Sequence, residues 1–419
     1  MELQPTINIG VIGSVSNGKS TLVKKITGIT TQKYLSEQIK NITIKLGYAN
    51  AKIYKCQKCP RPSCYQSFNS NVFNAKCKIC DEDMLLIKHV SFIDCPGHNH
   101  LLETMLNGTC IMDCTMLIES VGNKIIPTMQ TIEHVKATNI LQVPNILTCI
   151  NKIDLVDKNA AKLAINKLDD FLSEYSITGN IVPVSANMEW NIDVLCEYIC
   201  LYAKEPEHDL EQIPKMLVIR SFNVNKPNTN FQDLVGGVIG GSIVKGKFEI
   251  GDKVCLLPGL VYDNLEYKPI ISKIVSINSE NNILTKAIPG GLLGIGLDID
   301  PALTVNDRMS GQIMFLENNM DNHSVYKYLG IKLKPINEDY KSLKKGDKVS
   351  INHCGNNIEA TIDKINNLSM LLNINKLICI DNNDKITISK VRNNNENNTG
   401  IIYGMAILIP KYCVLAKAI

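Results

Sequence analysis

Residues Gly13–Ser20 read Gly-Ser-Val-Ser-Asn-Gly-Lys-Ser and match the phosphate-binding pattern G-x-x-x-x-G-K-S. The apolar run Ile7–Ile12 before them predicts a buried strand, and Ser20–Ile26 after them predicts the first turns of a helix. A loop in this position surrounds phosphates with backbone N–H groups at the positive end of a helix dipole. The alternative is a glycine-rich turn that matches by chance, and the motifs further along the chain decide against it.

This loop predicts a nucleotide site with a magnesium ion. We expect Lys19 to contact the β- and γ-phosphates and to assist catalysis, and we expect the Ser20 hydroxyl to ligate Mg²⁺. The loop residues that we expect to bind the nucleotide are Ser16, Asn17, Gly18, Lys19, Ser20 and Thr21.

A second motif follows the apolar run Val90–Ile93, which predicts another strand. Asp94 stands at the end of this strand, where it can hold Mg²⁺ through water. Gly97 can offer its N–H group to the γ-phosphate, so that its loop senses hydrolysis. His98 follows at once, and we expect it to orient or polarise the attacking water. A surface histidine is the alternative, and the adjacent Gly97 favours the catalytic interpretation.

Two further motifs predict recognition of the base. The run Asn145–Ile150 predicts a strand that ends at Asn151-Lys152-Ile153-Asp154. Asp154 can accept from the N1–H and the exocyclic amine of guanine, which adenine cannot supply, while Asn151 and Lys152 brace the loop and cover the ring. The strand predicted at Ile181–Val184 leads to Ser185-Ala186-Asn187, whose backbone can meet guanine O6.

Strands and helices alternate between these motifs. We expect a strand at Thr115–Ile118 and helices at Thr128–Ile140 and Lys158–Tyr175. Motifs that follow successive strands meet at the carboxyl edge of a doubly wound, mostly parallel sheet, where such folds bind nucleotides. Residues 1–207 are therefore predicted to form an α/β P-loop domain that binds GTP or GDP.

The segment 39–48 alternates in polarity and predicts an extended piece of chain. We place the Thr43 hydroxyl on Mg²⁺ and the γ-phosphate, so that its loop closes only when GTP is bound. A surface threonine in a strand is the alternative, and only the neighbouring motifs favour the ligand role.

Two C-x-x-C pairs stand at Cys56/Cys59 and Cys77/Cys80, with seventeen residues between them. Paired cysteines at this separation predict a tetrahedral Zn²⁺ site with a structural role, in which the metal orders a loop inserted in the GTP-binding domain. Cys64 is a rival ligand. The other alternative is an exposed insertion with idle thiols.

The second half of the chain has a different pattern. A polar, proline-bracketed linker at 208–214 precedes short strands punctuated by glycine, which predict two β-barrels at 215–325 and 326–419. Neither barrel contains a catalytic constellation, so composition alone indicates binding modules. The asparagine-rich run Asn393–Asn398 predicts a disordered loop tip.

Composition narrows the class of protein. The net charge is only +3 over 419 residues, so any RNA-binding surface must be a local patch. We find no room for a signal peptide and no apolar run that could span a bilayer, so we expect no membrane partner. Fifteen cysteines, most of them single in apolar runs, are typical of reduced thiols and predict a cytoplasmic protein.

Beyond its separate motifs, the chain resembles the translational GTPases, and within them the gamma subunits of translation initiation factor 2 of eukaryotes and archaea. The stretches that carry the resemblance are 41–54, 59–65, 89–98, 105–108, 218–227 and 308–312. The resemblance covers nearly the whole chain and weakens after about residue 325. The cysteine insertion and the 218–227 run are not features of elongation factors.

This resemblance implies a GTPase that carries initiator methionyl-tRNA to the small ribosomal subunit. It implies GTP or GDP, Mg²⁺ and a structural Zn²⁺ as bound groups. The implied protein partners are the alpha and beta subunits of the same heterotrimer, together with GTPase-activating and nucleotide-exchange factors. A GTP-binding assembly scaffold with negligible hydrolysis is a second hypothesis. An elongation-type carrier of aminoacyl-tRNA is a third, which the cysteine insertion disfavours.

The resemblance also implies a surface for the aminoacyl end of the tRNA. It would use Asn41–Tyr48 of the switch segment with Gly236–Ser242 and Pro289–Gly296 of the first barrel. The basic residues that we expect to contact tRNA phosphates are Lys226, Lys245, Lys247 and Arg308. Without the resemblance, we would assign the glycines to corners of the barrel and the lysines to solubility.

The sequence differs from the family at several functional positions. Ser14, Ser16 and Asn17 replace residues of the usual loop Gly-His-Val-Ala-His-Gly-Lys-Ser, and Asn99 stands where an aspartate is usual. The stretch Glu119–Met129 diverges as well. Because the glycines, Lys19 and the hydroxyl after it are kept, we expect nucleotide binding to persist. The replaced residues bear instead on the rigidity of the loop and on nucleotide exchange.

Overall fold

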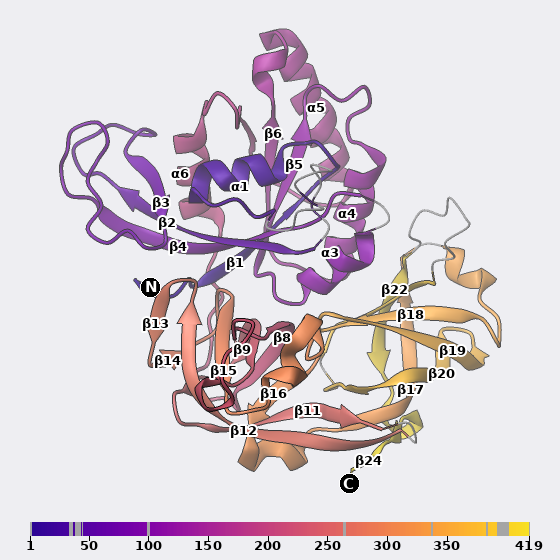
Figure 1. Cartoon of the computed structure of the whole chain (residues 1–419). Helices are drawn as coiled ribbons and strands as arrows, with labels where there is room; N and C mark the ends of the chain where they lie inside the picture. The colour runs from indigo at the N-terminus through magenta and orange to yellow at the C-terminus, as the bar shows by residue number, and fades with distance from the viewer. Residues whose placement is uncertain are drawn as a thin grey trace. The chain divides into compact units, whose positions relative to one another are not determined.

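The computed structural model divides the chain into two compact units, Met1–Glu207 and His208–Ile419 (Figure 1). It describes residues 2–32, 37, 43, 45–98, 101–262, 265–336, 338–382, 384–391 and 402–418. The predictions for Asn99, for Asn393–Asn398 and for most of the segment 39–44 lie outside the described residues.

The first unit is built on a seven-stranded sheet with the order β3-β2-β4-β1-β5-β6-β7. Strand β1 (Ile7–Ile12) is central and pairs in parallel with both β4 and β5, while β5, β6 and β7 continue in parallel. The pairings of β2 with β4 and with β3 are antiparallel, so β2 alone runs against the other strands. The predicted doubly wound, mostly parallel sheet is thus confirmed. The other strands are β2 (Gly47–Lys55), β3 (Tyr65–Asn69), β4 (Leu85–Asp94), β5 (Cys114–Ser120), β6 (Ile146–Asn151) and β7 (Ile181–Pro183).

Helices cover this sheet, and two of them agree with their predicted ranges to within one residue. These are α4 (Met129–Ile140), capped by the Thr128 side chain, and α5 (Lys158–Glu174), capped by Asp157. Capping of this kind satisfies N–H groups that a helix leaves unpaired at its start. The others are α1 (Lys19–Thr27), α3 (Leu102–Thr109) and α6 (Ile192–Tyr202).

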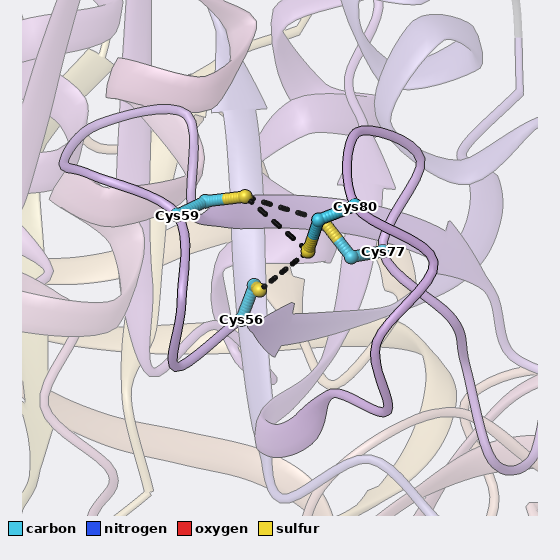
Figure 2. A group of neighbouring side chains, drawn as sticks. All are labelled: Cys56, Cys59, Cys77 and Cys80. Carbon is cyan, nitrogen blue, oxygen red and sulfur yellow. Dashed lines mark hydrogen bonds between the residues drawn. The ribbon is translucent and has the colours of Figure 1, made fainter.

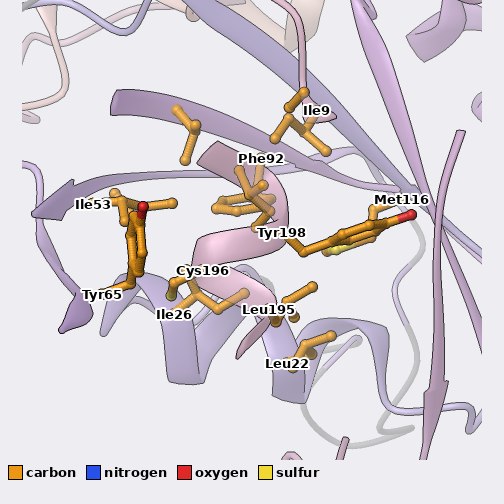
Figure 3. Close-up of a cluster of buried hydrophobic side chains, with 14 of the residues drawn as sticks. Ile9, Leu22, Ile26, Ile53, Tyr65, Phe92, Met116, Leu195, Cys196 and Tyr198 are labelled. Carbon is orange, nitrogen blue, oxygen red and sulfur yellow. The ribbon is translucent and has the colours of Figure 1, made fainter. Parts of the chain in front are cut away.

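The core of the first unit lies between the sheet and the helices α1 and α6. Figure 3 shows Ile9, Phe92 and Met116 from the strands among side chains of both helices. The helix residues drawn there are fully or nearly fully buried, and they include Leu22, Ile26, Leu195, Cys196 and Tyr198. Burial of this apolar surface holds α1 against the sheet, and this packing fixes the position of the helix that the loop leads into.

The second unit contains two barrels. The first closes because β12 pairs with β11 at one side and with β15 at the other, which completes a ring of six strands. Gly241 shows how tightly this ring is packed, since an added Cβ would meet the Leu217 carbonyl oxygen at 1.9 Å. The strands are β8 (Lys215–Phe222), β9 (Val238–Lys245), β11 (Lys253–Val261), β12 (Glu266–Ser279), β15 (Leu293–Leu297) and β16 (Ile313–Leu316).

The second barrel closes through the pairing of β17 with both β20 and β22. Both predicted barrels are therefore confirmed, while the exact division between them near residue 325 stays a prediction. The strands are β17 (Val325–Pro335), β18 (Lys348–His353), β19 (Asn356–Asn366), β20 (Ser369–Cys379), β21 (Ile386–Lys390) and β22 (Ile402–Leu408).

A buried ion cluster joins the two barrels. Lys215 of β8 donates to Asp381 Oδ2 at 2.7 Å and to Asp384 Oδ1 at 2.6 Å, both of which follow β20. His323 Nδ1 lies 2.9 Å from Asp381, and His353 Nε2 lies 3.1 Å from Asp384. Burial alone would lower the pKa of Lys215, but the charges of Asp384 and Asp381 outweigh it and hold that pKa above its ordinary value.

The cluster predicts acid-sensitive packing of the barrels. Burial alone would raise the pKa of Asp384, but His353 and Lys215 hold it below the ordinary range. This depressed pKa contributes stability that is present above the unfolded-state pKa of about 3.9 and is lost as pH falls through the folded-state value.

We therefore expect Asp384→Asn to destabilise the barrel unit by about 3–5 kcal/mol at neutral pH. The substitution removes one of the two carboxylates that neutralise the buried Lys215 and leaves only Asp381. Hydrogen exchange of strands β17 to β21 measures the loss. Glu338→Gln, in an exposed pair with Lys341, is the control and should change little. Unchanged protection in Asp384→Asn would show that the cluster adds nothing to stability.

Candidate nucleotide and zinc sites

The phosphate loop connects β1 to α1 with a backbone that turns sharply. Ser16 has a φ of 64° and Gly18 a φ of 91°, and the helix begins at Lys19. The Lys19 ammonium is buried and donates to the Ser14 carbonyl oxygen at 2.8 Å. Burial lowers the pKa of Lys19, and the charges of Asp94 and Glu119 oppose that change. A cation is thus held inside the loop, where it can meet phosphate oxygens.

Beside the loop, hydroxyl and carboxylate oxygens gather around Asp94. Ser20 Oγ lies 3.0 Å from Thr43 Oγ1, and Asp94 Oδ2 accepts from Thr31 at 2.6 Å and from Thr43 at 3.4 Å. Asp94 Oδ1 is buried and has no hydrogen-bond partner among the described residues. Burial raises the pKa of Asp94, although hydrogen bonds from Ser20 and Thr31 oppose this. Oxygen ligands are those that Mg²⁺ prefers, so this donor set fits the ion.

Thr43 itself does not lie in a strand. Of the extended segment predicted at 39–48, residues 47 and 48 lie in β2, whereas the described residues 43, 45 and 46 lie outside any strand. Thr43 turns instead toward Ser20 and Asp94, because these buried polar groups need hydrogen-bond partners. Thr31 is a further member of this set that no sequence motif indicated.

Gly97 lies directly against the phosphate loop. A Cβ there would come within 2.5 Å of Lys19 Nζ and within 2.7 Å of Gly13 O and Val15 N. Only glycine allows this approach, which brings the backbone at 97 against the loop that is predicted to bind phosphates. His98 follows with an exposed side chain that lines the same cavity.

Three other side chains hold together the loops that are predicted to read the base. Asn151 Nδ2 donates to Asn17 O at 2.8 Å, and its Oδ1 accepts from Ala186 N at 3.0 Å. Ser185 Oγ donates to Asp154 Oδ1 at 2.6 Å. Asn151 thus ties the phosphate loop to the last predicted motif, and Asp154 is oriented by Ser185.

All four motifs border one cavity of about 650 Å³. Asn17 and Asp94 are the two expected binding residues that do not line it, since both side chains are buried behind its wall. Five lining residues were not predicted: Val15, Lys24, Lys25, Thr30 and Gln32. The expected residues that do line it are Ser16, Gly18, Lys19, Ser20, Thr21, Thr43, Gly97, His98, Asn151, Lys152, Asp154, Ser185, Ala186 and Asn187.

The four paired cysteines also converge, in the insertion between β2 and β4. Figure 2 shows Cys56 and Cys59 on one loop facing Cys77 and Cys80 on another. The Sγ–Sγ distances are 3.5 Å for Cys56–Cys80, 3.7 Å for Cys59–Cys77 and 3.6 Å for Cys59–Cys80. Four thiolates around one Zn²⁺ at about 2.3 Å would stand roughly 3.8 Å apart, so the cluster fits the metal.

Among the four thiols, Cys77 has the environment that best suits a cation. Burial alone would raise the pKa of Cys77, but the backbone N–H groups of Ile79 and Cys80 outweigh it and lower that pKa to about 6. A thiolate is the form that binds metal. Cys64 is buried apart from this group, and its backbone oxygen accepts from Cys56 N at 2.9 Å. The geometry therefore favours Cys59 over Cys64 as a ligand.

We expect purified protein to contain about one zinc per chain, as one tetrahedral site requires. Cys59→Ser should lose the metal because it removes a converging thiolate, whereas Cys64→Ser is the matched control and should keep it. Elemental analysis of both variants and of the parent measures the content. A folded, active protein without zinc would contradict the site.

The residues expected at a tRNA surface have structural contacts of their own. Added Cβ atoms would strike Leu297 O at Gly236 and Ser276 Oγ at Gly296, so barrel packing explains these glycines. Lys247 pairs with Glu211 at 3.1 Å. By contrast, a Cβ added at Gly294 would make only an ordinary van der Waals contact, with Val238 Cγ1 at 3.9 Å.

The sequence matches known proteins over both units. Residues 4–205 match the family described as the elongation factor Tu GTP binding domain. The gamma subunit of eukaryotic translation initiation factor 2 from Encephalitozoon cuniculi is 42% identical over 403 residues, which are 94% of this chain and 91% of that protein. The Schizosaccharomyces pombe subunit gamma is 43% identical over 82% of this chain and 78% of its own length. Subunit 3 of the same factor from Drosophila melanogaster is 46% identical over 74% of this chain and 67% of its own length.

Solved structures of two elongation factors share the fold. A bacterial selenocysteine-specific elongation factor superposes with a TM-score of 0.70 at 21% identity, covering 97% of this chain and 58% of that one. Elongation factor SelB from Methanococcus maripaludis, bound to a GTP analogue, superposes with a TM-score of 0.71 at 18% identity. The match covers 98% of this chain and 80% of that one. In the described part of the chain, every helix is too short or too polar to cross a membrane.

Proposed function

The chain belongs to the gamma subunits of eukaryotic translation initiation factor 2, within the translational GTPases, and from this membership we propose that it carries initiator methionyl-tRNA to the small ribosomal subunit. In this role it is the nucleotide- and tRNA-binding core of a heterotrimer with an alpha and a beta subunit. Hydrolysis of GTP, stimulated by an activating protein and the ribosome, releases the tRNA. An exchange factor restores GTP, and the cycle takes place in the cytoplasm.

One observation carries the nucleotide part of this proposal. Four sequence motifs that are far apart in the chain border a single cavity, and its lining includes both Lys19 and Asp154. Such a cavity takes phosphates at the helix N-terminus and a guanine at the carboxylate. Ser20, Thr43 and Asp94 would hold Mg²⁺, which neutralises charge on the transferred phosphoryl group. Cys56, Cys59, Cys77 and Cys80 would hold the structural Zn²⁺.

His98 favours hydrolysis over the alternative of a scaffold that only binds GTP. It follows Gly97, whose backbone reaches the phosphate loop, and its imidazole borders the cavity. We assign it the orientation of the attacking water, and we assign Lys19 and the Gly97 N–H group to the charge that develops on the γ-phosphate. An elongation-type carrier has weaker support, because the relatives at more than 40% identity are named as initiation factor subunits.

The tRNA part is tested by equilibrium binding in each nucleotide state. Because the switch segment is proposed to close part of the tRNA surface, we expect methionyl initiator tRNA to bind roughly 5- to 150-fold tighter with GTP than with GDP. Binding is measured with the reconstituted heterotrimer at several salt concentrations. Each phosphate contact should add about 0.7–0.9 to the slope of log affinity against log salt.

Elongator methionyl-tRNA is the control ligand in the same assay, and it should bind more weakly. Equal affinities with GTP and GDP would support the scaffold hypothesis instead. Equal affinities for the two tRNAs would support a general carrier of aminoacyl-tRNA.

A further inference from the structure

The end of β5 and the residues just after it hold the side of the phosphate loop that faces away from the cavity. Asn17 is fully buried there. Its Nδ2 donates to Ile118 O at 2.9 Å and to Glu119 Oε1 at 3.0 Å, and its Oδ1 accepts from Asn123 Nδ2 at 3.0 Å. With the bond from Asn151 to its backbone oxygen, Asn17 has four hydrogen bonds to described residues outside the phosphate loop.

Glu119 is the centre of these contacts. Its side chain is fully buried at the end of β5. Besides Asn17, Oε1 accepts from Asn123 Nδ2 and from Ser120 N, while Oε2 accepts from Thr128 N at 3.2 Å. A buried carboxylate is costly unless several donors satisfy it. Glu119 therefore joins the phosphate loop, the end of β5 and the start of α4 in one network.

Two more bonds reach the loop from α4. Gly13 N donates to His134 Nδ1 at 3.1 Å, and the Ser14 hydroxyl donates to Gln130 Oε1. Burial and the nearby charge of Lys19 lower the pKa of His134 to about 3, so its ring is neutral and its Nδ1 can accept. The loop is thus tied from behind at residues 13, 14 and 17.

The loop needs such support because of its backbone. Ser16 and Gly18, on either side of Asn17, both have positive φ. This conformation is unfavourable for a serine and persists only where the surroundings determine it. It also sets the direction of the N–H groups that a phosphate would meet. Holding the Asn17 side chain is therefore a direct way to hold the phosphate-binding conformation.

We propose that Glu119 is a positioning residue of the nucleotide site, which acts through Asn17 to keep the phosphate loop in its binding conformation and so slows release of guanine nucleotides. The two divergent stretches, the loop and residues 119–129, then form one unit in which Asn17 and Glu119 depend on each other. This inference rests on the proposed function, because it concerns how tightly GDP and GTP are held.

The test compares release of a fluorescent GDP analogue from the full-length chain with Mg²⁺ present. In Glu119→Gln an NH₂ group replaces one carboxylate oxygen. That NH₂ group then faces N–H donors, which it cannot accept from. Losing charge-assisted bonds of this kind should speed release by about 10- to 100-fold. Asn17→Ala should act similarly, and the double variant should release no faster than the faster single variant. Asn139→Ala, on the exposed face of α4, is the matched control and should release at the parental rate.

A second readout separates positioning from general loss of stability. The ³¹P resonance of the β-phosphate in bound GDP reports its surroundings, so it should shift in Glu119→Gln and in Asn17→Ala but not in Asn139→Ala. If Glu119→Gln does not fold, Asn123→Ala carries the same expectation, since Asn123 is only half-buried and contacts both partners.

Three results would each overturn the inference without affecting the proposal that the chain binds guanine nucleotides. They are release at the parental rate in Glu119→Gln, additive effects of the two substitutions, and an unshifted ³¹P resonance. A parent chain that binds no guanine nucleotide would overturn the proposed function itself.

Discussion

Replacing His98 with alanine is expected to slow stimulated GTP hydrolysis by about 10²- to 10⁴-fold while GTP affinity stays the same. The imidazole borders the cavity next to Gly97, whose backbone lies against the phosphate loop. A group in that place can orient the attacking water, and we expect it to act on the reaction and not on ground-state binding. Single-turnover hydrolysis on the ribosome, with the activating protein present, measures the change.

His208→Ala is the control for this experiment, because that histidine lies in the linker and not at the cavity. His98→Gln distinguishes orientation from proton transfer, since glutamine can hold a water but cannot take up a proton. Equal rates for the parent and His98→Ala would remove the histidine from the reaction and favour the scaffold hypothesis.

Replacing Asp154 with asparagine is expected to lower GTP affinity by roughly one to two orders of magnitude, as the loss of a charge-assisted pair predicts. Ser185 Oγ donates to Asp154 Oδ1. In the variant this bond favours the amide oxygen at that position, which turns the NH₂ group toward the base. The amide then faces the exocyclic amine of guanine as one donor against another, whereas the carbonyl of xanthine can accept from it.

Competition binding with GTP and xanthosine triphosphate measures this exchange of preference. Asp157→Asn is the matched control, because asparagine also caps helices and position 157 caps α5 without lining the cavity. If Asp154→Asn binds GTP as the parent does, the base is read by other residues.

Local motifs explain why so many of the residues that border the cavity are predictable from the sequence. Gly13–Ser20, Asp94–His98 and Asn151–Asp154 each combine a strand end with a short run of fixed chemistry, so the sheet brings them together wherever the strands order correctly. The alternation at 39–48 does not predict the position of the Thr43 side chain, because that side chain bonds to Ser20 and Asp94, which are distant in sequence.

Contacts between distant residues could not be predicted in this way. Thr31 bonds to Asp94 with no motif around it, and Asn17 and Glu119 meet across 102 positions. Both Asn17 and the segment after Glu119 were recognised as divergent, but separately. Their packing against each other follows from the parallel pairing of β1 with β5, which the sequence pattern does not specify residue by residue.

The ion cluster between the barrels has a consequence for the order in which the protein is made. Lys215 leaves the ribosome 169 residues before Asp384, the partner that it needs for burial. At a synthesis rate of about 5–20 residues per second, roughly ten to thirty seconds pass between them. During that time the ammonium must remain in water, because a buried charge without its counter-ions is too costly. The first barrel can therefore begin to form during translation, but its edge at Lys215 can close only after the second barrel has emerged.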